Sequence, residues 1–540
     1  MQLSSLFATA LAVISLGAST ASAAIIPRQD GTLKFVKGSP LTFEYQTSQP
    51  DAKNWIAIYY SNYGGPVKEE YVTDSLTWEW AKESKGKVSL TTTKLQPGAY
   101  TVYFLAKNGY KWLANPIDVI VPGDGPFQFI VPIFTTLNGR VGDEFEADIS
   151  GLIESPAQRE PSFTKVGGDD WIQVSPDGSI SGTPTKGGMS FVSVKATSKK
   201  NDHATLNVTI PVQNARTPLV EKLTVLTFNM WVGGRKINGF HKKQVRYLAN
   251  SDADIVGLQE SGDGSGIRLA QALGWNVWQG KDVSIITRYP ISQVYDGTGV
   301  AGAVRVSLDK WKHDVIVWNA HLGYTPYGPY DLCFDNVTVD EVMKRETQSG
   351  RTPQIVAIMD KMKPHIANAN NVPVILMGDF NAPSHLDWTD ATRAQHCNVG
   401  PVNWPTSAEP TKAGLVDSFR EVHSNPITEP GITWSPIYRT NDGRPEPLDR
   451  IDFVYHKGLR TLDSQAQIVG SIKPEPNHAD NEWPSDHAAV RSVFRLRFHD
   501  QLVWFESDHS PIGAALVGIR HGPWAVSGHE EQMMGARNDK

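Results

Sequence analysis

The second half of the chain, from Leu223 onward, alternates short apolar runs with segments of helical periodicity, which restricts it to a layered α/β fold. The helical periodicity covers residues 242–249, 267–273 and 339–362. The apolar runs have the length of buried strands and cover residues 223–228, 255–258, 315–318 and 374–377. Because the carboxyl ends of such strands form one edge of a sheet, where binding crevices lie, we expect the residues at these ends to meet.

Carboxylates, amides and imidazoles follow the apolar runs, namely Asn229, Glu260, His321, Asp379 and Asn381. The same pattern includes three residues that precede further apolar runs, Asp452, Asp486 and His487. Any one of them is more often a turn, cap or structural residue than a ligand. As a set they would be costly to desolvate without a compensating ion, so we predict a functional site.

The donor types in this set indicate the chemistry. Oxygen donors from Asn229, Glu260 and Asp486, without a Cys/His cage, suit a hard cation, Mg²⁺ before Mn²⁺ or Ca²⁺, and disfavour zinc. A hard cation beside two histidines suits the attack of water on phosphorus, because both can stabilise charge on phosphoryl oxygens. The Gly-x-Ser-x-Gly elbow of serine hydrolases does not occur in this part of the sequence.

Six ordered motifs resemble the signature of the endonuclease/exonuclease/phosphatase superfamily: Thr227-Phe228-Asn229, Leu258-Gln259-Glu260, Asn319-Ala320-His321-Leu322, Gly378-Asp379-Phe380-Asn381, Arg450-Ile451-Asp452-Phe453 and Ser485-Asp486-His487. The resemblance implies a four-layered α/β sandwich over residues 222–498 and a metal-dependent phosphoesterase activity. A second Ser-Asp-His copy, at residues 507–509, is the weaker candidate because the strand-like run 488–494 follows the first copy.

The resemblance also implies roles for individual residues. Glu260 would be the principal metal ligand, supported by Asn229 and Asp486. Asp379 would orient or activate water, and Asn381 would hold the phosphate. His321 would bind the phosphoryl oxygens. His487, oriented by Asp452, would serve as a general base or as a hydrogen-bond donor to the phosphate.

The first half of the chain predicts secretion and two β modules. Residues 1–23 contain an apolar run and end in Ala21-Ser22-Ala23, which is typical of a secretory signal peptide. After it, no apolar run approaches the roughly 18 residues of a membrane span. Alternating runs predict a β-sandwich over residues 32–121, and a second β-rich module over 126–214 resembles immunoglobulin-like modules. The tail, residues 499–540, has no assigned fold.

In a secreted protein the cysteines can form a disulfide and asparagines in sequons can be glycosylated. Cys333 and Cys397 are expected to form a disulfide in an oxidising compartment, with two free buried thiols as the alternative. Asn207 and Asn336 each begin an Asn-Val-Thr sequon, so both are candidate glycosylation sites.

Charge and aromatic residues bear on the substrate. With a formal net charge of -6 and no Lys/Arg cluster, the chain favours a small or lipid-derived phosphoester over nucleic acid. A secreted nuclease remains the alternative, followed by a non-catalytic adhesion protein. Aromatic residues could contact substrate or simply pack structurally: Tyr324, Tyr327, Tyr330, Phe334, Trp388, Trp404 and Trp434. Exposed aromatics near Trp78 and Trp80 could attach the protein to a surface or polymer.

Overall fold

A computed structural model of the protein describes residues 31–496, except for the short segments 37–40, 62–64, 92–94, 96–97, 122–124, 155–159, 263 and 310–312. All described residues belong to one compact unit. The expected signal peptide at 1–23, the tail at 499–540 and the second Ser-Asp-His copy at 507–509 lie outside the described residues.

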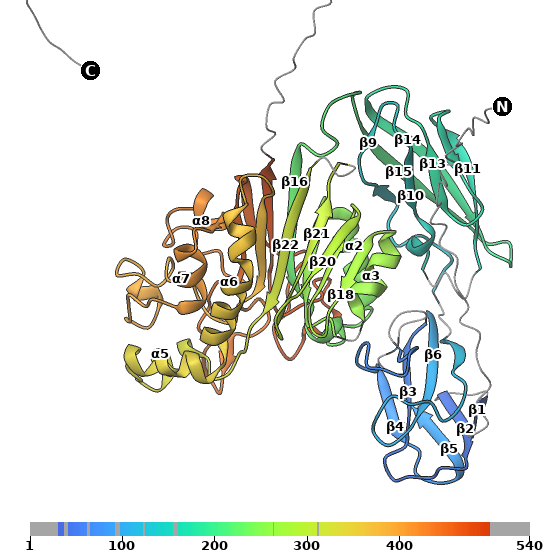
Figure 1. Ribbon diagram of the computed structural model, residues 1–540, viewed down its shortest axis with the longest axis horizontal. Coiled ribbons are helices and arrows are strands. Elements are labelled where there is room, and N and C mark those ends of the chain that lie inside the picture. Colours follow the sequence, from blue (N-terminus) through green and yellow to red (C-terminus); the bar gives the residue numbers. More distant parts are fainter. Residues whose placement is uncertain are drawn as a thin grey trace, which may run out of the picture. The chain divides into compact units, whose positions relative to one another are not determined.

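The first β module consists of two antiparallel sheets around one core (Figure 1). One sheet has the order β1-β2-β5, formed by Gly31–Val36, Leu41–Thr47 and Lys85–Leu90. The other has the order β4-β3-β6-β7, formed by Thr77–Trp80, Trp55–Tyr60, Gly98–Leu105 and Ile117–Val121. Side chains alternate along β3, so Ile56 and Ile58 face the core while Trp55, Ala57 and Tyr59 face the opposite side.

The second β module also contains two sheets. The smaller has the order β10-β13-β12, formed by Phe145–Asp148, Ser179–Gly182 and Ile172–Val174. The larger has the order β11-β14-β15-β8, formed by Ser162–Gly168, Gly188–Thr197, His203–Gln213 and Ile133–Thr135. The short strand β9, Gly139–Arg140, also pairs with β15, and a 3-10 turn, η1, covers Ser150–Leu152. The N-terminal region is therefore rich in antiparallel β structure, as expected.

The remaining residues form an α/β domain with two six-stranded sheets. The first has the order β18-β19-β17-β16-β29-β28, formed by Asn276–Gln279, Ser284–Thr287, Ile255–Gln259, Lys222–Asn229, Ala489–Arg495 and Arg460–Gln467. The second has the order β20-β21-β22-β23-β27-β24, formed by Ile291–Tyr295, Ala301–Ser307, Asp314–His321, Val374–Asp379, Asp452–Lys457 and Val416–Asp417. A small hairpin pairs β25, Thr440–Asn441, with β26, Arg444–Pro445.

The two six-stranded sheets contact each other through their central strands, including β16 with β23 and β17 with β22. Gly257 on β17 lies at a close approach of the sheets, because a Cβ at this position would lie 2.6 Å from the Met377 side chain and 2.8 Å from the Asn319 amide oxygen. Residue 257 must therefore lack a side chain for the sheets to pack at this distance.

Helices pack against both sheets. Helix α2, Phe240–Asn250, and helix α3, Ser265–Leu273, share a hydrophobic core with β16 and β17. Helix α6, Arg351–Ala367, packs against β22 and β23. The other helical elements connect strands: α4 at Gly328–Phe334, α5 at Val339–Gln348, α7 at Pro405–Lys412, α8 at Ser418–Val422, and short 3-10 turns η2 at Val232–Gly234, η3 at Arg393–Gln395 and η4 at His478–Asp480.

The single helix predicted over residues 339–362 is wrong, because this segment forms two helices, α5 and α6. Gly350 separates them with a φ of 88°, a left-handed conformation that glycine adopts readily and that ends the first helix. Pro353 then lies in the first turn of α6, where its missing N–H removes no helical hydrogen bond.

The second β module shares its hydrophobic core with helices α2 and α3 of the α/β domain. The Arg288 guanidinium donates to the carbonyl oxygens of Thr135 and Thr136, at 2.7 Å each. Arg140 forms a buried ion pair of 2.7 Å with Asp309 across the same boundary. These buried contacts hold the second module firmly against the α/β domain.

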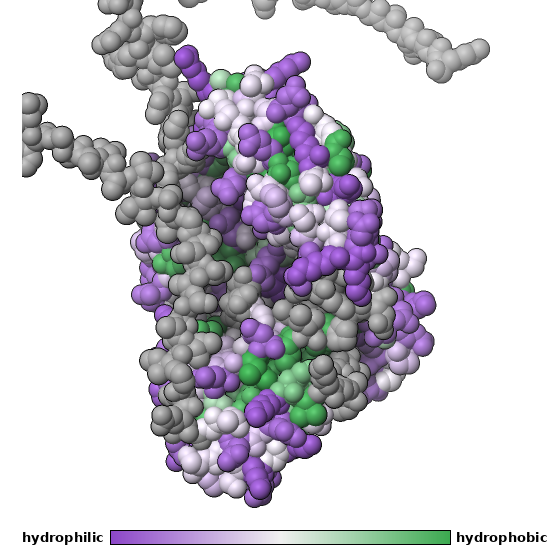
Figure 2. Space-filling model, turned by 90° about the vertical axis from the view of Figure 1, so that its right-hand side faces the viewer, coloured by the Kyte–Doolittle hydropathy of each residue, from purple (hydrophilic) through white to green (hydrophobic). Residues whose placement is uncertain are grey.

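The side of the protein that carries the β modules is mostly hydrophilic, with scattered hydrophobic patches between the polar residues (Figure 2). Along the described part of the chain, no helix is both long and apolar enough to span a bilayer.

Candidate active site

The strand-end residues singled out in the sequence gather at one edge of the two facing sheets. Strands β16 and β17 are parallel, as are β22 and β23, so their carboxyl ends lie together in pairs. Strands β29 and β27 run antiparallel to their neighbours β16 and β23, which places their amino ends at the same edge. This topology explains why the polar residues follow four strands but precede two others.

Asp379, at the end of β23, is the centre of the group and is almost fully buried. Its Oδ2 accepts a hydrogen bond of 2.9 Å from Asn229 Nδ2. The same oxygen lies 3.6 Å from His321 Nε2 and 3.7 Å from His487 Nε2. Its other oxygen, Oδ1, accepts from the main-chain N–H of Asn381 at 2.8 Å. Side chains from both sheets therefore converge on one carboxylate.

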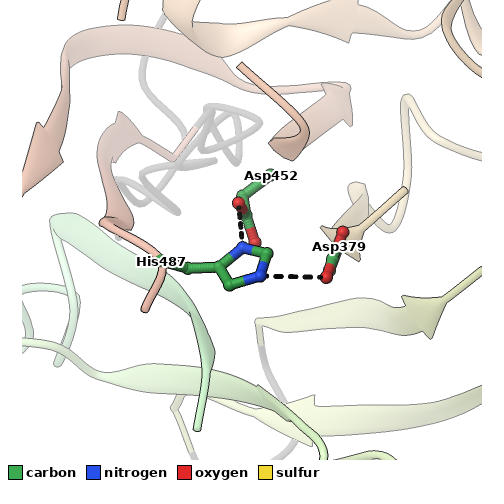
Figure 3. Close-up of side chains that lie close together, drawn as sticks. All are labelled: Asp379, Asp452 and His487. Carbon is green, nitrogen blue, oxygen red and sulfur yellow. Dashed lines mark hydrogen bonds and ion pairs between the residues drawn. The ribbon is translucent and has the colours of Figure 1, made fainter. Parts of the chain in front are cut away.

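His487 lies between two buried carboxylates (Figure 3). Its Nδ1 is 2.9 Å from Asp452 Oδ2, which fixes the orientation of the ring and leaves Nε2 directed at Asp379. Burial alone would lower the pKa of His487, but the charges of Asp452 and Asp379 raise it well above its usual value. The Trp434 ring lies 4.9 Å from the imidazole ring and covers it. This environment therefore favours the protonated form of His487.

His321 has a matching arrangement on the other side of Asp379. Its Nδ1 is 2.6 Å from Oδ2 of Asp282, a half-exposed residue in the loop between β18 and β19. Burial alone would lower the pKa of His321, but the hydrogen bond to Asp282 and the neighbouring carboxylates, Asp379 among them, raise it to about 9. Each histidine therefore has one nitrogen oriented by a carboxylate and the other directed at Asp379.

A second group of oxygens lies beside this one. Glu260 has a φ of 55°, a left-handed conformation that is uncommon outside glycine. Its carboxylate accepts from the main-chain N–H of Val232 and lies 3.5 Å from Asn229 Nδ2. Asp486 is buried, and its Oδ1 has no hydrogen-bond partner among the described residues. Burial, together with the charge of Glu260, raises the pKa of Asp486 to about 7.

A layer of amides connects the two sheets beneath this edge. Gln259 Nε2 donates to Asn319 Oδ1 at 2.6 Å, which joins β17 to β22. Asn319 Nδ2 donates in turn to the carbonyl oxygens of Leu258 and Ser284, at 2.9 Å each. Asn381, in a left-handed conformation, donates from its side-chain amide to the Leu322 carbonyl at 2.9 Å. These bonds fix the positions of the strand ends that carry the site.

The structure brings together every site residue proposed from the motifs, and it adds Asp282, which the sequence analysis missed. Asp282 lies in the short loop Gly280-Lys281-Asp282, two residues before β19, and neither β18 nor β19 is among the apolar runs whose ends identified the other residues. Trp434, which the sequence left open between a site and a structural role, covers His487.

The other aromatic candidates are mainly structural. Trp388 and Trp404 are fully buried and pack together in their own hydrophobic cluster. Tyr330 contacts both Tyr327 and Phe334, so most of this loop packs on its own rings. Tyr324 is the exception, because it is 68% exposed.

Cys333 and Cys397 form a disulfide that ties this loop to the segment after β23. Asn336 is exposed, whereas Asn207 is half-buried on β15. Glycosylation at these two positions stays a prediction.

Comparison with known proteins agrees with this geometry. Residues 226–487 match the model of the Endonuclease/Exonuclease/phosphatase family. An uncharacterized protein of Caenorhabditis elegans is 34% identical over 285 residues, which cover 50% of this chain and 90% of that protein. The chain therefore belongs to the endonuclease/exonuclease/phosphatase family, whose signature lies in the α/β domain described above.

Solved structures of the same superfamily are similar to half of the chain. The structure of truncated TDP2 from Caenorhabditis elegans is 17% identical, covers 51% of this chain and 98% of its own, and gives a TM-score of 0.34. An AP endonuclease from Archaeoglobus fulgidus is 17% identical, covers 50% of this chain and 99% of its own, and gives a TM-score of 0.33.

Proposed function

We propose that this protein is a secreted phosphoesterase that uses a divalent metal ion to hydrolyse a phosphodiester or phosphomonoester on a four-layered α/β sandwich. The observation that carries the proposal is the convergence of two carboxylate-oriented histidines on Asp379, beside the carboxylates of Glu260 and Asp486. Membership of the family agrees with a hydrolytic reaction at phosphorus.

The residues present fit a hard cation at Glu260 and Asp486. Asp486 offers a buried oxygen with no hydrogen-bond partner among the described residues, and the nearby Glu260 charge has no buried cationic side chain bonded to it. Asn229 would complete the oxygen set only with its amide turned, because Nδ2 faces Glu260 and Asp379 while Oδ1 accepts from the Trp231 main-chain N–H. Asp379, Asp452 and His487 also lie close enough together to share an ion. In that group the His487–Asp452 hydrogen bond engages Nδ1 and Oδ2, whereas Asp452 Oδ1, like Asp486 Oδ1, is buried with no hydrogen-bond partner among the described residues.

A bound Mg²⁺, or otherwise Mn²⁺ or Ca²⁺, would supply charge that offsets the negative phosphoryl oxygens. The protein's own residues would then position the phosphoryl group and the attacking water and would donate hydrogen bonds to the phosphoryl oxygens. The protonated Nε2 atoms of His321 and His487 would donate to the phosphoryl oxygens on which charge develops. Asp379 would orient the attacking water and accept its proton, and Asn381 would hold the phosphate. Asp282 and Asp452 would keep the two rings in the productive orientation.

The substrate class follows from charge rather than from the catalytic residues, which serve any phosphoester. The formal net charge of -6 gives no general attraction for a nucleic-acid backbone, so we favour a small or lipid-derived phosphoester. Secretion rests on the sequence of residues 1–23. Both points are proposals about this chain and not properties of its relatives.

The proposal is tested with purified protein on bis-p-nitrophenyl phosphate, p-nitrophenyl phosphate and supercoiled plasmid. Chelation should abolish turnover and added Mg²⁺ should restore it. Glu260→Ala and His487→Ala should lose all measurable activity, whereas loss of one oxyanion donor in His321→Ala should cost about a hundredfold. Faster hydrolysis of the small esters than nicking of plasmid supports the favoured substrate class.

Matched controls are available on the same chain. Glu341→Ala changes a half-buried glutamate on α5, and His203→Ala changes an exposed histidine on the second β module. Both should keep wild-type rates. Full activity in folded Glu260→Ala or His487→Ala would contradict the proposed site, and plasmid nicking that exceeds small-ester turnover would favour a nuclease.

A further inference from the structure

The first β module has an aromatic surface on the outer side of its β4-β3-β6-β7 sheet, away from the module's core. Trp55 and Tyr59 reach this side from β3, because they alternate with the core residues Ile56 and Ile58. Trp78 and Trp80 reach the same side from β4, where Trp80 pairs with Trp55 and Trp78 with Ala57. The small Ala57 leaves room between these large rings.

These rings line a cavity of about 350 Å³, together with Asp74 and Tyr110. The rings stand at steep angles to one another, with interplanar angles of 85° between Trp55 and Trp78 and 75° between Trp78 and Trp80. Tyr110 stands at 70° to Trp55. Walls that face in different directions form a box, whereas a site for sugar stacking needs a flat, open ring face.

Asp74 supplies the charge of this pocket. It is exposed, forms no ion pair among the described residues, and is the single charged residue among those described as lining the cavity. Its Oδ1 accepts a hydrogen bond of 3.3 Å from the Tyr71 hydroxyl, whose ring contacts Tyr110. The pocket therefore combines electron-rich ring faces with one uncompensated carboxylate.

Folding of the module explains the buried Trp55 and Tyr59, which belong to a second hydrophobic cluster, but it does not explain the exposed Trp78. The apolar core between the two sheets is a separate cluster, and Trp78 remains 44% exposed on an edge strand. Trp55 and Tyr59 are buried at the back of the pocket, whereas Trp78 is exposed and Trp80 half-buried at its opening, and exposed apolar surface of this kind marks interaction sites.

We infer that this pocket binds an organic ammonium ion, in particular a quaternary ammonium group such as that of choline. Such a cation has no N–H to donate, so it is held by the negative faces of aromatic rings and by a nearby carboxylate rather than by hydrogen bonds. The inference is independent of the proposed phosphoesterase reaction and concerns a ligand site on a different part of the chain.

The pocket also adjoins the α/β domain. The main-chain N–H of Asp74 donates to the Gly262 carbonyl at 3.0 Å, and Gly262 follows Glu260 by two residues. Asp74 therefore takes part both in the pocket and in the contact with the segment that carries Glu260. For this reason, binding is best measured on the full-length protein.

The test is a titration of full-length protein with choline chloride at constant ionic strength, followed by tryptophan fluorescence and by calorimetry. Saturable binding is expected, and dimethylbutanol, the neutral carbon analogue of choline, should bind at least about tenfold more weakly. Trp78→Ala and Asp74→Asn should each weaken choline binding by about tenfold. Both residues are exposed, so the variants should fold, which circular dichroism checks.

Phe35→Ala and Glu79→Gln are the matched controls, since they change an exposed ring and an exposed acid of the same module outside the pocket. Both should bind choline as the wild type does. Equal affinity for choline and its neutral analogue, or unchanged binding in Trp78→Ala and Asp74→Asn, would overturn the inference. Saturation by methyl glucoside instead of choline would identify a carbohydrate site and would overturn it as well.

Discussion

Arg351, the first residue of α6, is fully buried and holds the loop that follows His321. Its guanidinium pairs with Glu346 of α5, which is also fully buried, with Nε 2.8 Å from Oε2. Of the remaining N–H groups, one on Nη2 donates to Glu346 Oε1 and the others donate to the carbonyl oxygens of Gly323, Tyr324 and Pro326. Replacing Arg351 with methionine keeps most of the volume but removes the charge and five hydrogen bonds.

The loss of folding stability in Arg351→Met follows from the Glu346 charge that is left buried. Burial already raises the pKa of Glu346, and without Arg351 its carboxylate would be buried and unpaired. Removing one partner of a buried ion pair typically costs about 3–5 kcal/mol. For a domain of this size, that loss lowers the melting temperature by on the order of 10 °C. Removing both charges in Glu346→Leu/Arg351→Met should recover much of the loss, because no charge then remains buried.

Thermal and urea unfolding would measure the stability of four proteins: the wild type, Arg351→Met, Glu346→Leu/Arg351→Met and Lys344→Met. Lys344→Met is the matched control, since it breaks an ion pair with Glu341 in which both side chains are well exposed. That control should cost at most about 1 kcal/mol. The reasoning is refuted if Arg351→Met is as stable as Lys344→Met, or if the double variant is less stable than Arg351→Met.

Three further predictions concern the site and the packing around it. The charged form of His321 stabilises the metal-free fold below about pH 6.5, and this contribution is lost as the pH rises through about 9. Asp282→Asn should therefore lower the melting temperature in chelator at pH 6 and do so less at pH 9; an equal effect at both would argue against the pair. Cys397→Ser should cost about 4 kcal/mol in denaturant unfolding, because the disulfide closes a loop with a sequence separation of 64 residues. Gly257→Ala should cost about 1–3 kcal/mol of stability, because the added Cβ would clash with the side chains of Met377 and Asn319. Wild-type stability of this variant would show that the two sheets can move apart without cost.

The sequence was most informative where burial and polarity change abruptly. Each apolar run ends on a residue that would be unfavourable inside a sheet, so the positions of Asn229, Glu260, His321 and Asp379 could be predicted from the strands alone. Asp452 and His487 precede their apolar runs, and only the antiparallel pairing of β27 and β29 explains why they reach the same edge.

Two features could not be predicted by the same reasoning. Asp282 lies in a loop, and its contact with His321 joins residues 39 positions apart, so no local pattern specifies it. The break between α5 and α6 did have a local signal, Gly350 followed by Pro353, but the apolar periodicity continues across it and masked the end of the first helix. The left-handed backbone of Gly350, and not the hydrophobic pattern, separates α5 from α6.

The shared core of the second β module and helices α2 and α3 limits how the protein can be shortened. A fragment that begins at residue 215 would expose the apolar faces of both helices and would remove the partners that Arg288 and Asp309 have in the second module. Such a fragment should aggregate, so the loss of its activity would say nothing about catalysis. The shortest fragment that stays soluble should begin near residue 126, so that the second β module remains packed on the α/β domain.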